Sequence, residues 1–471
     1  MISKHAPSAV AWLLSFGLLA CESNLDAPEA GGETGSGGTT MGGQSQIDPG
    51  ALGILGGAAS GGGASHEAKG GSFSASAGAA GAFSALAGAS ALAGASALAG
   101  ASATGGAGGA LGTGGTGGSP ASTANGTGAP ASSPSGYGKA TTGGGNATPL
   151  VASSLGALQA AIDAYESGGL VLEYSGKFAF SSITDPCKQH TLPAQTLEIK
   201  NKSDITILGQ PGSSANFGVH IAATSSNVII RNMTIGLTPG GDASDIISVE
   251  GMSGGAPKNI WIDHNEMFTS LATCAGAGDT AFDGMIDVKK GADNITVSYN
   301  YMHDHHKVSL NGYSDSDDQA RHITFDHNLF ENIGARAPLQ RHGYSHVVNN
   351  YFLNVSTSCI NVRMNGYALV EANFFENVVN PVTARDSDAV GFWDLRGNNL
   401  TSAADVGTGN QFGISWTSGS SGTLNATSWT STATYPVALG YNYTAHPFQC
   451  VHDGLRAAAG AGKALATLKC Q

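Results

Sequence analysis

Short runs of β-branched residues recur along the chain from Leu197 onward, and each run ends in an asparagine followed by further apolar or aromatic residues. The aligned segments are residues 227–232, 260–265, 295–300, 323–328, 346–350 and 369–373, and their asparagines lie 33, 35, 28, 22 and 23 residues apart. A coil whose turns need 22 or 23 residues, lengthened by loops elsewhere, explains this series. Each turn buries its inner face against its neighbours, and stacked asparagines can hydrogen-bond along the coil. In the alternative, a β-sandwich, no fixed residue recurs at a fixed offset. The repeat predicts an all-β chain folded as a right-handed parallel β-helix.

The first turn of such a solenoid would be open at its end. Residues 154–164 can cover it, because Ser154 can cap a helix and Leu155, Leu158 and Ile162 follow helical spacing. We therefore expect an N-terminal capping helix.

Composition divides the chain into three parts. Residues 1–21 hold a short apolar run typical of a signal peptide, and Leu18-Leu19-Ala20-Cys21 resembles the bacterial lipobox, in which the cysteine is lipidated. An ordinary signal peptide with an incidental cysteine is the alternative. Residues 22–148 are rich in Gly, Ala, Ser and Thr and predict a disordered linker, because they cannot bury enough apolar surface to fold. Residues 149–471 predict the folded domain. We expect a secreted or cell-surface monomer whose membrane contact is a lipid on Cys21.

The chain carries a formal net charge of −13, which argues against a nucleic-acid partner. An acidic protein can bind a polyanion only through local basic groups or through a bound cation.

Four aspartates lie on successive turns or in their loops, namely Asp242, Asp245, Asp283 and Asp287. Carboxylates this dense repel one another unless a cation lies among them, and oxygen ligands favour Ca²⁺. A solvated acidic face is the alternative interpretation.

Cations gather on the same turns. Lys289 follows Asp287 by two residues and so shares its strand face, Lys307 lies one turn on, and Arg336 and Arg341 flank Pro338 one turn beyond that. Such a concentration suggests an anion-binding site, and ion pairing to the acidic residues is the alternative.

Two segments carry a family resemblance. Residues 259–265 read Asn-Ile-Trp-Ile-Asp-His-Asn, and residues 336–341 read Arg-Ala-Pro-Leu-Gln-Arg, followed by His346-Val-Val-Asn-Asn350. They resemble the V-W-I-D-H and R-x-P-x-x-R signatures of the extracellular pectate lyases of the first polysaccharide lyase family. The similarity extends from about residue 154 to Cys470. It implies a right-handed parallel β-helix with a cleft on one sheet, and Ca²⁺-dependent β-elimination of polygalacturonate.

The resemblance also implies roles for single residues. The catalytic arginine falls on Arg336, and Lys289, Lys307 and Arg341 fall on substrate-binding positions. The Ca²⁺ carboxylates fall on Asp245, Asp283 and Asp287, with Asp242 near a fourth. Two departures from the family pattern affect the metal site. The loop at Asp242 is one residue longer than the pattern, so its carboxylate can miss the ion, and Asp283 stands where the family can have the longer glutamate.

Five cysteines follow Cys21, so at least one thiol is free, and the lack of a Cys-x-x-Cys pair argues against zinc. The resemblance implies the disulfides Cys187–Cys274 and Cys450–Cys470 and leaves Cys359 unpaired.

Elimination requires a base that removes the C5 proton of a galacturonate. Arginine is effectively always protonated in proteins, but Ca²⁺, Lys307 and Arg341 would all favour the neutral form of Arg336. The other candidates are His303, Asp304, His305 and His306, which flank Lys307.

Three other functions compete. A pectin lyase acts on methyl esters and should lack the Ca²⁺ aspartates, a polygalacturonase needs paired aspartates for hydrolysis, and a non-catalytic surface β-helix could bind pectin without a base.

The segment Trp261-Ile-Asp263-His264 is interpreted as structural, because adjacent residues on a strand point to opposite faces. Residues 315–318 resemble a Ca²⁺ loop but lack the glycine and distal glutamate of an EF-hand, so we interpret them as an acidic surface turn.

Overall fold

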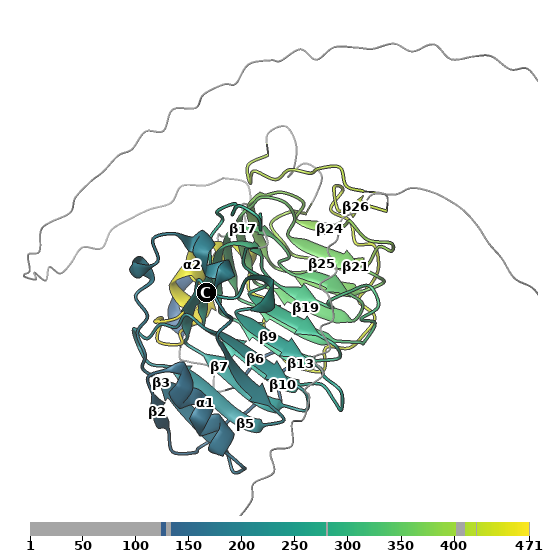
Figure 1. Cartoon of the computed structure of the whole chain (residues 1–471). Coiled ribbons are helices and arrows are strands. Elements are labelled where there is room, and N and C mark those ends of the chain that lie inside the picture. Colours follow the sequence, from purple (N-terminus) through teal and green to yellow (C-terminus); the bar gives the residue numbers. More distant parts are fainter. Residues whose placement is uncertain (1–123, 129–132, 279–280, 402–409, 421, 471) are drawn as a thin grey trace, which may run out of the picture. The chain divides into compact units, whose positions relative to one another are not determined.

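The computed structural model describes residues 124–128, 133–278, 281–401, 410–420 and 422–470. Within them the chain winds through three parallel sheets, and each turn between residues 226 and 384 contributes one strand to each sheet (Figure 1). One such turn is β13 (Asp293–Ser298), β14 (Tyr301–Lys307) and β15 (Leu310–Asn311). The predicted parallel β-helix is confirmed.

The three sheets differ in length. The ten-stranded sheet contains β2 (Leu150–Ala152), β3 (Leu170–Tyr174), β5 (Ser203–Gly209), β7 (Ser226–Arg231), β10 (Lys258–Asp263), β13, β16 (His322–Asp326), β19 (Tyr344–Val348), β22 (Tyr367–Glu371) and β25 (Phe392–Arg396). The six-stranded sheet contains β8 (Thr234–Gly236), β11 (Glu266–Phe268), β14, β17 (Leu329–Ala335), β20 (Tyr351–Val355) and β23 (Phe374–Val378). The nine-stranded sheet contains β4 (Thr196–Lys200), β6 (Gly218–Ala222), β9 (Ile247–Glu250), β12 (Ile286–Lys289), β15, β18 (Leu339–Arg341), β21 (Ile360–Arg363), β24 (Val382–Ala384) and β26 (Leu424–Asn425). All pairs in these sheets are parallel except β24 with β26.

Short elements complete the description. They are the helices α1 (Leu155–Ala164) and α2 (Phe448–Ala458), the 3₁₀ helices η1 (Phe180–Ser182), η2 (Pro186–Thr191) and η3 (Gly241–Ala243), and the antiparallel pair β1 (Ala124–Gly128) and β27 (Thr467–Cys470). The expected capping helix is α1: the Ser154 side chain accepts a hydrogen bond from the Ala157 amide, and Leu158 and Ile162 are buried in the solenoid core.

Asparagines line the turn between the ten-stranded and the six-stranded sheets. In five successive steps the amide nitrogen of one asparagine donates to the side-chain oxygen of the next, at 2.9 to 3.0 Å, through Asn265, Asn300, Asn328, Asn350, Asn373 and Asn398. The predicted ladder is confirmed and reaches one turn further, to Asn398. The prediction is wrong for its first member, Asn232. On that turn the backbone amide that donates to the Asn265 side chain belongs to Met233. Asn232 has a φ of 57° and donates instead to the Gly209 carbonyl.

Residues 133–148, which composition assigned to the linker, lie against the outer face of the ten-stranded sheet. Gly138 donates its amide to Thr296 Oγ1 at 3.0 Å, and Gly144 donates to Thr206 Oγ1 at 2.9 Å. A Cβ on Gly144 would lie 2.3 Å from the Leu170 carbonyl oxygen, so glycine permits this close approach. The folded part therefore begins before residue 149, while residues 1–123, with the expected signal peptide and lipobox, lie outside the described residues.

The two expected disulfides are present, Cys187–Cys274 and Cys450–Cys470, and Cys359 is free and buried. Among the described residues, no helix is long and apolar enough to cross a membrane.

Candidate active site

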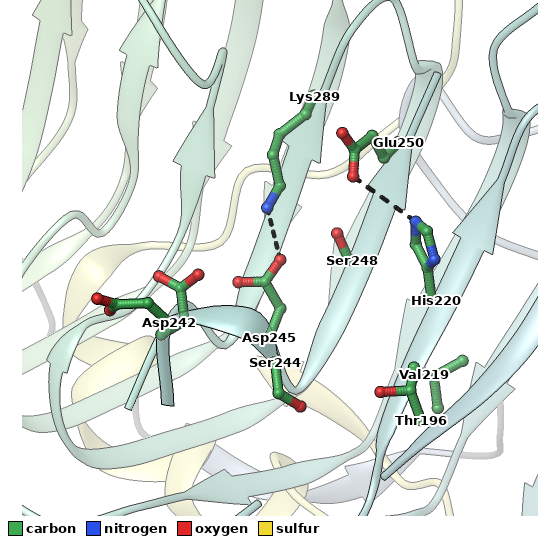
Figure 2. Close-up of a pocket in the computed structure, with 10 residues that line it drawn as sticks. Thr196, Val219, His220, Asp242, Ser244, Asp245, Ser248, Glu250 and Lys289 are labelled. Atoms are coloured by element: carbon green, nitrogen blue, oxygen red, sulfur yellow. Dashed lines mark hydrogen bonds and ion pairs between the residues drawn. The ribbon is translucent and has the colours of Figure 1, made fainter. Parts of the chain in front are cut away.

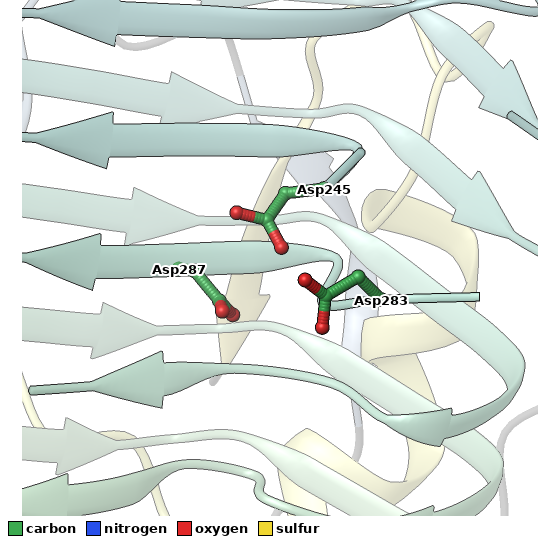
Figure 3. A group of neighbouring side chains, drawn as sticks. All are labelled: Asp245, Asp283 and Asp287. Atoms are coloured by element: carbon green, nitrogen blue, oxygen red, sulfur yellow. The ribbon is translucent and has the colours of Figure 1, made fainter. Parts of the chain in front are cut away.

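Three aspartates converge at the beginning of two neighbouring strands of the nine-stranded sheet (Figure 3). Asp245 lies two residues before β9, Asp283 lies three residues before β12, and Asp287 is the second residue of β12. One carboxylate oxygen from each lies within 4.8 Å of those of the other two. The parallel pairing of β9 with β12 brings together residues about 40 positions apart in the sequence.

Backbone hydrogen bonds hold the carboxylates in place. The Gly284 amide donates to Asp245 Oδ1 and the Leu310 amide donates to Asp287 Oδ1, both at 3.0 Å. A Cβ on Gly284 would lie 2.1 Å from Asp287 Oδ1, so only glycine fits between these carboxylates.

The carboxylates oppose one another's ionisation. Burial, and then the charge of Asp245, raise the pKa of Asp283 to about 6 and that of Asp287 well above its ordinary value. Lys289 partly compensates, since its Nζ lies 2.6 Å from Asp245 Oδ2 and 3.5 Å from Asp287 Oδ2. A pocket lined in part by Asp245 and Lys289 opens beside the carboxylates (Figure 2). Asp245 and Asp287 are buried and Asp283 is partly buried. Three such carboxylates repel one another when all are charged, and a hard divalent cation such as Ca²⁺ would relieve that repulsion.

Asp242, named with these three from the sequence, is not part of the close group. It lies on η3 with a side chain 63% exposed, and its Oδ1 is 3.5 Å from Lys307 Nζ. Lys307, the last residue of β14, also lies 3.6 Å from Asp283 Oδ1, so it borders the carboxylates from the neighbouring sheet.

The two arginines lie on the next turn. Arg336 occupies the bend between β17 and β18, where its carbonyl accepts from the Ser309 amide at 2.7 Å. The positive charge of Arg336, like that of Lys289, acts to lower the pKa of Asp287. Burial and the charge of Asp245 act in the opposite direction and outweigh both cations. Arg341 ends β18, and its Nε lies 2.6 Å from Asp315 Oδ1.

Comparison with known proteins agrees with this arrangement. The family model described as pectate lyase matches residues 79–464. The chain belongs to the pectate lyase family.

Solved pectate lyases are similar to this chain over about 70% of its length. Pectate lyase II from Xanthomonas campestris pv. campestris is 54% identical, with a TM-score of 0.67 over 70% of this chain and 99% of its own. Pectate lyase C from Erwinia chrysanthemi, solved with 30 mM Ca²⁺, is 41% identical, with a TM-score of 0.67 over 72% and 99%. A mutant of pectate lyase C in complex with pentagalacturonic acid is 40% identical, with a TM-score of 0.66 over 72% and 99%.

Within this pectate lyase fold, the other candidate bases are engaged elsewhere. His305 is 1% exposed, its ring nitrogens contact Thr269 Oγ1 at 2.6 Å and the Lys307 carbonyl at 2.7 Å, and burial lowers its pKa to about 3. His303 pairs with Asp304 at 2.8 Å and stacks on Phe268. The His306 ring contacts the Leu271 carbonyl at 3.2 Å. These partners leave Arg336 as the candidate base.

Sequence reasoning missed two further arginines on the turns that follow Arg341. Arg341 pairs in register with Arg363 of β21, and Arg385 follows β24 by one residue. The three arginines are 22 residues apart, the length of one turn, and that spacing was the signal. Burial, and then the charge of Arg341, lower the pKa of Arg363 to about 10, so these cations crowd one another.

The Trp261–His264 segment is structural, as interpreted, but for a different reason. Asp263 is 1% exposed and contacts Arg231 Nε at 2.6 Å, Ser298 Oγ at 2.6 Å and His264 Nδ1 at 2.7 Å. Asp263 and His264 thus meet rather than point apart, because His264 leaves the strand with a φ of 51°. The network belongs to the ten-stranded sheet, whereas the aspartates lie at the nine-stranded one.

Proposed function

We propose that this chain is a Ca²⁺-dependent pectate lyase that cleaves polygalacturonate by β-elimination and releases 4,5-unsaturated oligogalacturonides. The observation that carries the proposal is the group of three close carboxylates, with Lys289 and Lys307 within 3.6 Å of them and the charge of Arg336 acting on Asp287. An acidic protein can accept a polyanion where a cation turns its carboxylates into a binding site. The Ca²⁺ in one related structure and the pentagalacturonate in another support this assignment.

In the reaction, Ca²⁺ would be held by Asp245, Asp283 and Asp287 and would draw negative charge from the substrate carboxylate. Lys307 and Arg341 bind that carboxylate and stabilise the charge that develops on it when the C5 proton leaves. Arg336 takes the proton. The C5–H electron pair then forms the C4–C5 double bond as the C4–O bond breaks, and the C4 oxygen leaves with the other half of the chain and takes up a proton from water. Lys289, hydrogen-bonded to Asp245, completes the cationic border of the cleft.

The proposal is tested by the ultraviolet absorbance of the unsaturated product. We expect absorbance to rise on polygalacturonate, to stop in EDTA and to return with added Ca²⁺. Activity that survives chelation, or a preference for highly methylated pectin, would instead identify a pectin lyase. Binding of polygalacturonate without product would identify a non-catalytic β-helix.

We also propose that the protein is secreted and anchored to the cell surface through a lipid on Cys21, with residues 22–123 as the tether. The two disulfides support export, because such bonds persist in oxidising compartments.

A further inference from the structure

The loop between β15 and β16 is built around a buried ion pair. Arg321 is 2% exposed, and its Nη1 donates to Asp317 Oδ1 at 2.8 Å. Asp317 Oδ2 accepts from the backbone amides of Lys290 at 2.9 Å and Tyr313 at 3.1 Å. Asp317 is only 5% exposed, so the interpretation of residues 315–318 as a surface turn is wrong at this position. The pair holds residues 313–321 in one conformation, because buried charges persist only when paired and hydrogen-bonded.

This loop is joined to the strand that carries Arg341. Arg321 Nη2 donates to the Arg341 carbonyl at 2.7 Å. Gly312, with a φ of +94°, lies so close that a Cβ would be 2.4 Å from Arg321 Nη2 and 3.1 Å from Arg341 Cβ. The His342 ring contacts the Asp315 carbonyl at 2.9 Å, which fixes the backbone of Asp315 as well.

The loop thereby orients the Arg341 side chain. Nε donates to Asp315 Oδ1 at 2.6 Å, and Nη1 donates to the Gly312 carbonyl at 3.0 Å. Because the guanidinium is planar, two such bonds set its plane and its rotation. Among the described residues, Nη2 has no hydrogen-bond acceptor, so this part of the group remains available for a carboxylate outside the chain.

Asp315 also offsets the repulsion between the Arg341 guanidinium and a neighbouring cation. Its neighbour in register is Arg363, and among the described residues the ion pair of Arg341 is with Asp315. The Asp315 side chain is 39% exposed and lies outside the group formed by Asp245, Asp283 and Asp287.

We infer that Asp315 is a positioning residue for substrate binding: it holds the Arg341 guanidinium with Nη2 available to a galacturonate carboxylate. The inference rests on the proposed function, since it assigns the ligand of Arg341.

If Asp315 does not position Arg341, its removal should not weaken substrate binding. Removing a negative charge from an acidic protein should help it to bind a polyanion. Asp318 provides the matched control, because it lies exposed in the same loop and its hydrogen bond is with the adjacent Gln319 at 3.3 Å. Asp315→Asn and Asp318→Asn change the net charge equally, but only the first alters the partner of Arg341.

The experiment compares both variants of the full chain with Ca²⁺ present. For Asp315→Asn we expect kcat/KM on polygalacturonate to fall about tenfold, mostly through KM, because asparagine keeps an oxygen acceptor but loses the charge that strengthens its hydrogen bond to Arg341. For Asp318→Asn, KM should be unchanged or lower. In an Arg341→Ala background, Asp315→Asn should have no further effect, since its route of action is gone.

A KM for Asp315→Asn at or below that of the unmodified chain would overturn the inference. So would an equal loss in the Arg341→Ala background, which would indicate that the loop acts by another route. Calorimetric titration with pentagalacturonate compares the variants even if no turnover is found, so failure of the proposed lyase activity remains distinguishable. Unchanged thermal unfolding of Asp315→Asn verifies that the fold is intact.

Discussion

Arg336 combines a proposed chemical role with an uncommon backbone. Its φ of 63° lies in the left-handed region, and among the described residues no other arginine has a positive φ. Backbone strain of this kind is often retained at functional sites, where surrounding contacts maintain it. Here the Ser309 amide binds the Arg336 carbonyl, and the following Ala337 is buried. These contacts hold the Arg336 backbone in the bend between two strands, and from there its charge acts on Asp287.

We predict that Arg336→Lys abolishes turnover and leaves Ca²⁺ affinity and the fold intact. Lysine keeps the charge but loses the planar guanidinium, so this substitution separates proton removal from plain electrostatics. Loss of one preorganised catalytic group costs about 10²–10³ in kcat. The checks are the initial rate of absorbance increase and a Ca²⁺ titration. More than a tenth of the original turnover would show that another group takes the proton.

At the scale of elements, the asparagine ladder joins consecutive turns of the solenoid. Asn328 Oδ1 accepts from both the backbone amide and the side chain of Asn300, at 3.0 Å each. Its amide nitrogen donates to the Val297 carbonyl and to Asn350, at 2.9 Å each. One side chain therefore satisfies buried groups on two turns.

Asn328→Ala should destabilise the protein by roughly 3–5 kcal/mol, because it leaves several buried donors and acceptors unsatisfied. A second, exposed ladder consists of Asn332, Asn354 and Asn377. The control is Asn354→Gly in this ladder, because Asn354 donates to Asn332 at 2.9 Å and has a φ of 57° that glycine adopts freely. We expect this control to cost less than about 1 kcal/mol. Denaturant unfolding measures both, and equal losses would refute the role given to the buried ladder.

Three strands of the nine-stranded sheet carry a second charged cluster, beside the carboxylates (Figure 2). His220 Nδ1 lies 2.9 Å from Glu198 Oε2, and its Nε2 lies 3.6 Å from Glu250 Oε2. Glu250 also pairs with Lys290 at 2.9 Å. Burial opposes protonation of His220, but the two glutamates outweigh it and raise its pKa to about 9.

This shift predicts a pH dependence of stability. A pKa raised from about 6.5 in the unfolded chain contributes stability that is complete below pH 6.5 and is lost as the pH rises to about 9. The contribution is of order 3–4 kcal/mol, because the pKa rises from 6.5 to about 9 and each pKa unit corresponds to about 1.4 kcal/mol. His220→Gln should therefore unfold more easily at pH 6 and lose less stability between pH 6.5 and 9. Thermal unfolding across this range is the measurement, and parallel curves for the two proteins would contradict the prediction.

At the scale of the whole molecule, the described solenoid follows a long amino-terminal segment that begins with the expected lipobox. We predict that Cys21→Ser moves the protein from the membrane fraction to the soluble fraction without loss of lyase activity. The reason is that the lipid is the proposed anchor, whereas the catalytic groups all follow residue 241. Fractionation followed by an activity assay tests this, and persistent membrane association would exclude the lipid anchor.

The sequence by itself determined the solenoid, its turn length and the asparagine ladder, because a periodic fold repeats its buried positions along the chain. It also indicated Asp245, Asp283, Asp287, Lys289 and Lys307, which the structure brings close together. It could not show that residues 133–148 lie on the ten-stranded sheet, since their low-complexity composition hides the glycines that permit close contact.

Only the tertiary structure decided how side chains on different turns meet. It showed that Asp242 lies outside the group of three close aspartates. It showed that Met233, and not Asn232, bonds to Asn265, and that Asp315 pairs with Arg341. Each outcome depends on loop conformation and on the register between stacked turns. Neither follows from local residue preferences, because the partners are brought together by parallel pairing of strands that are distant in the sequence.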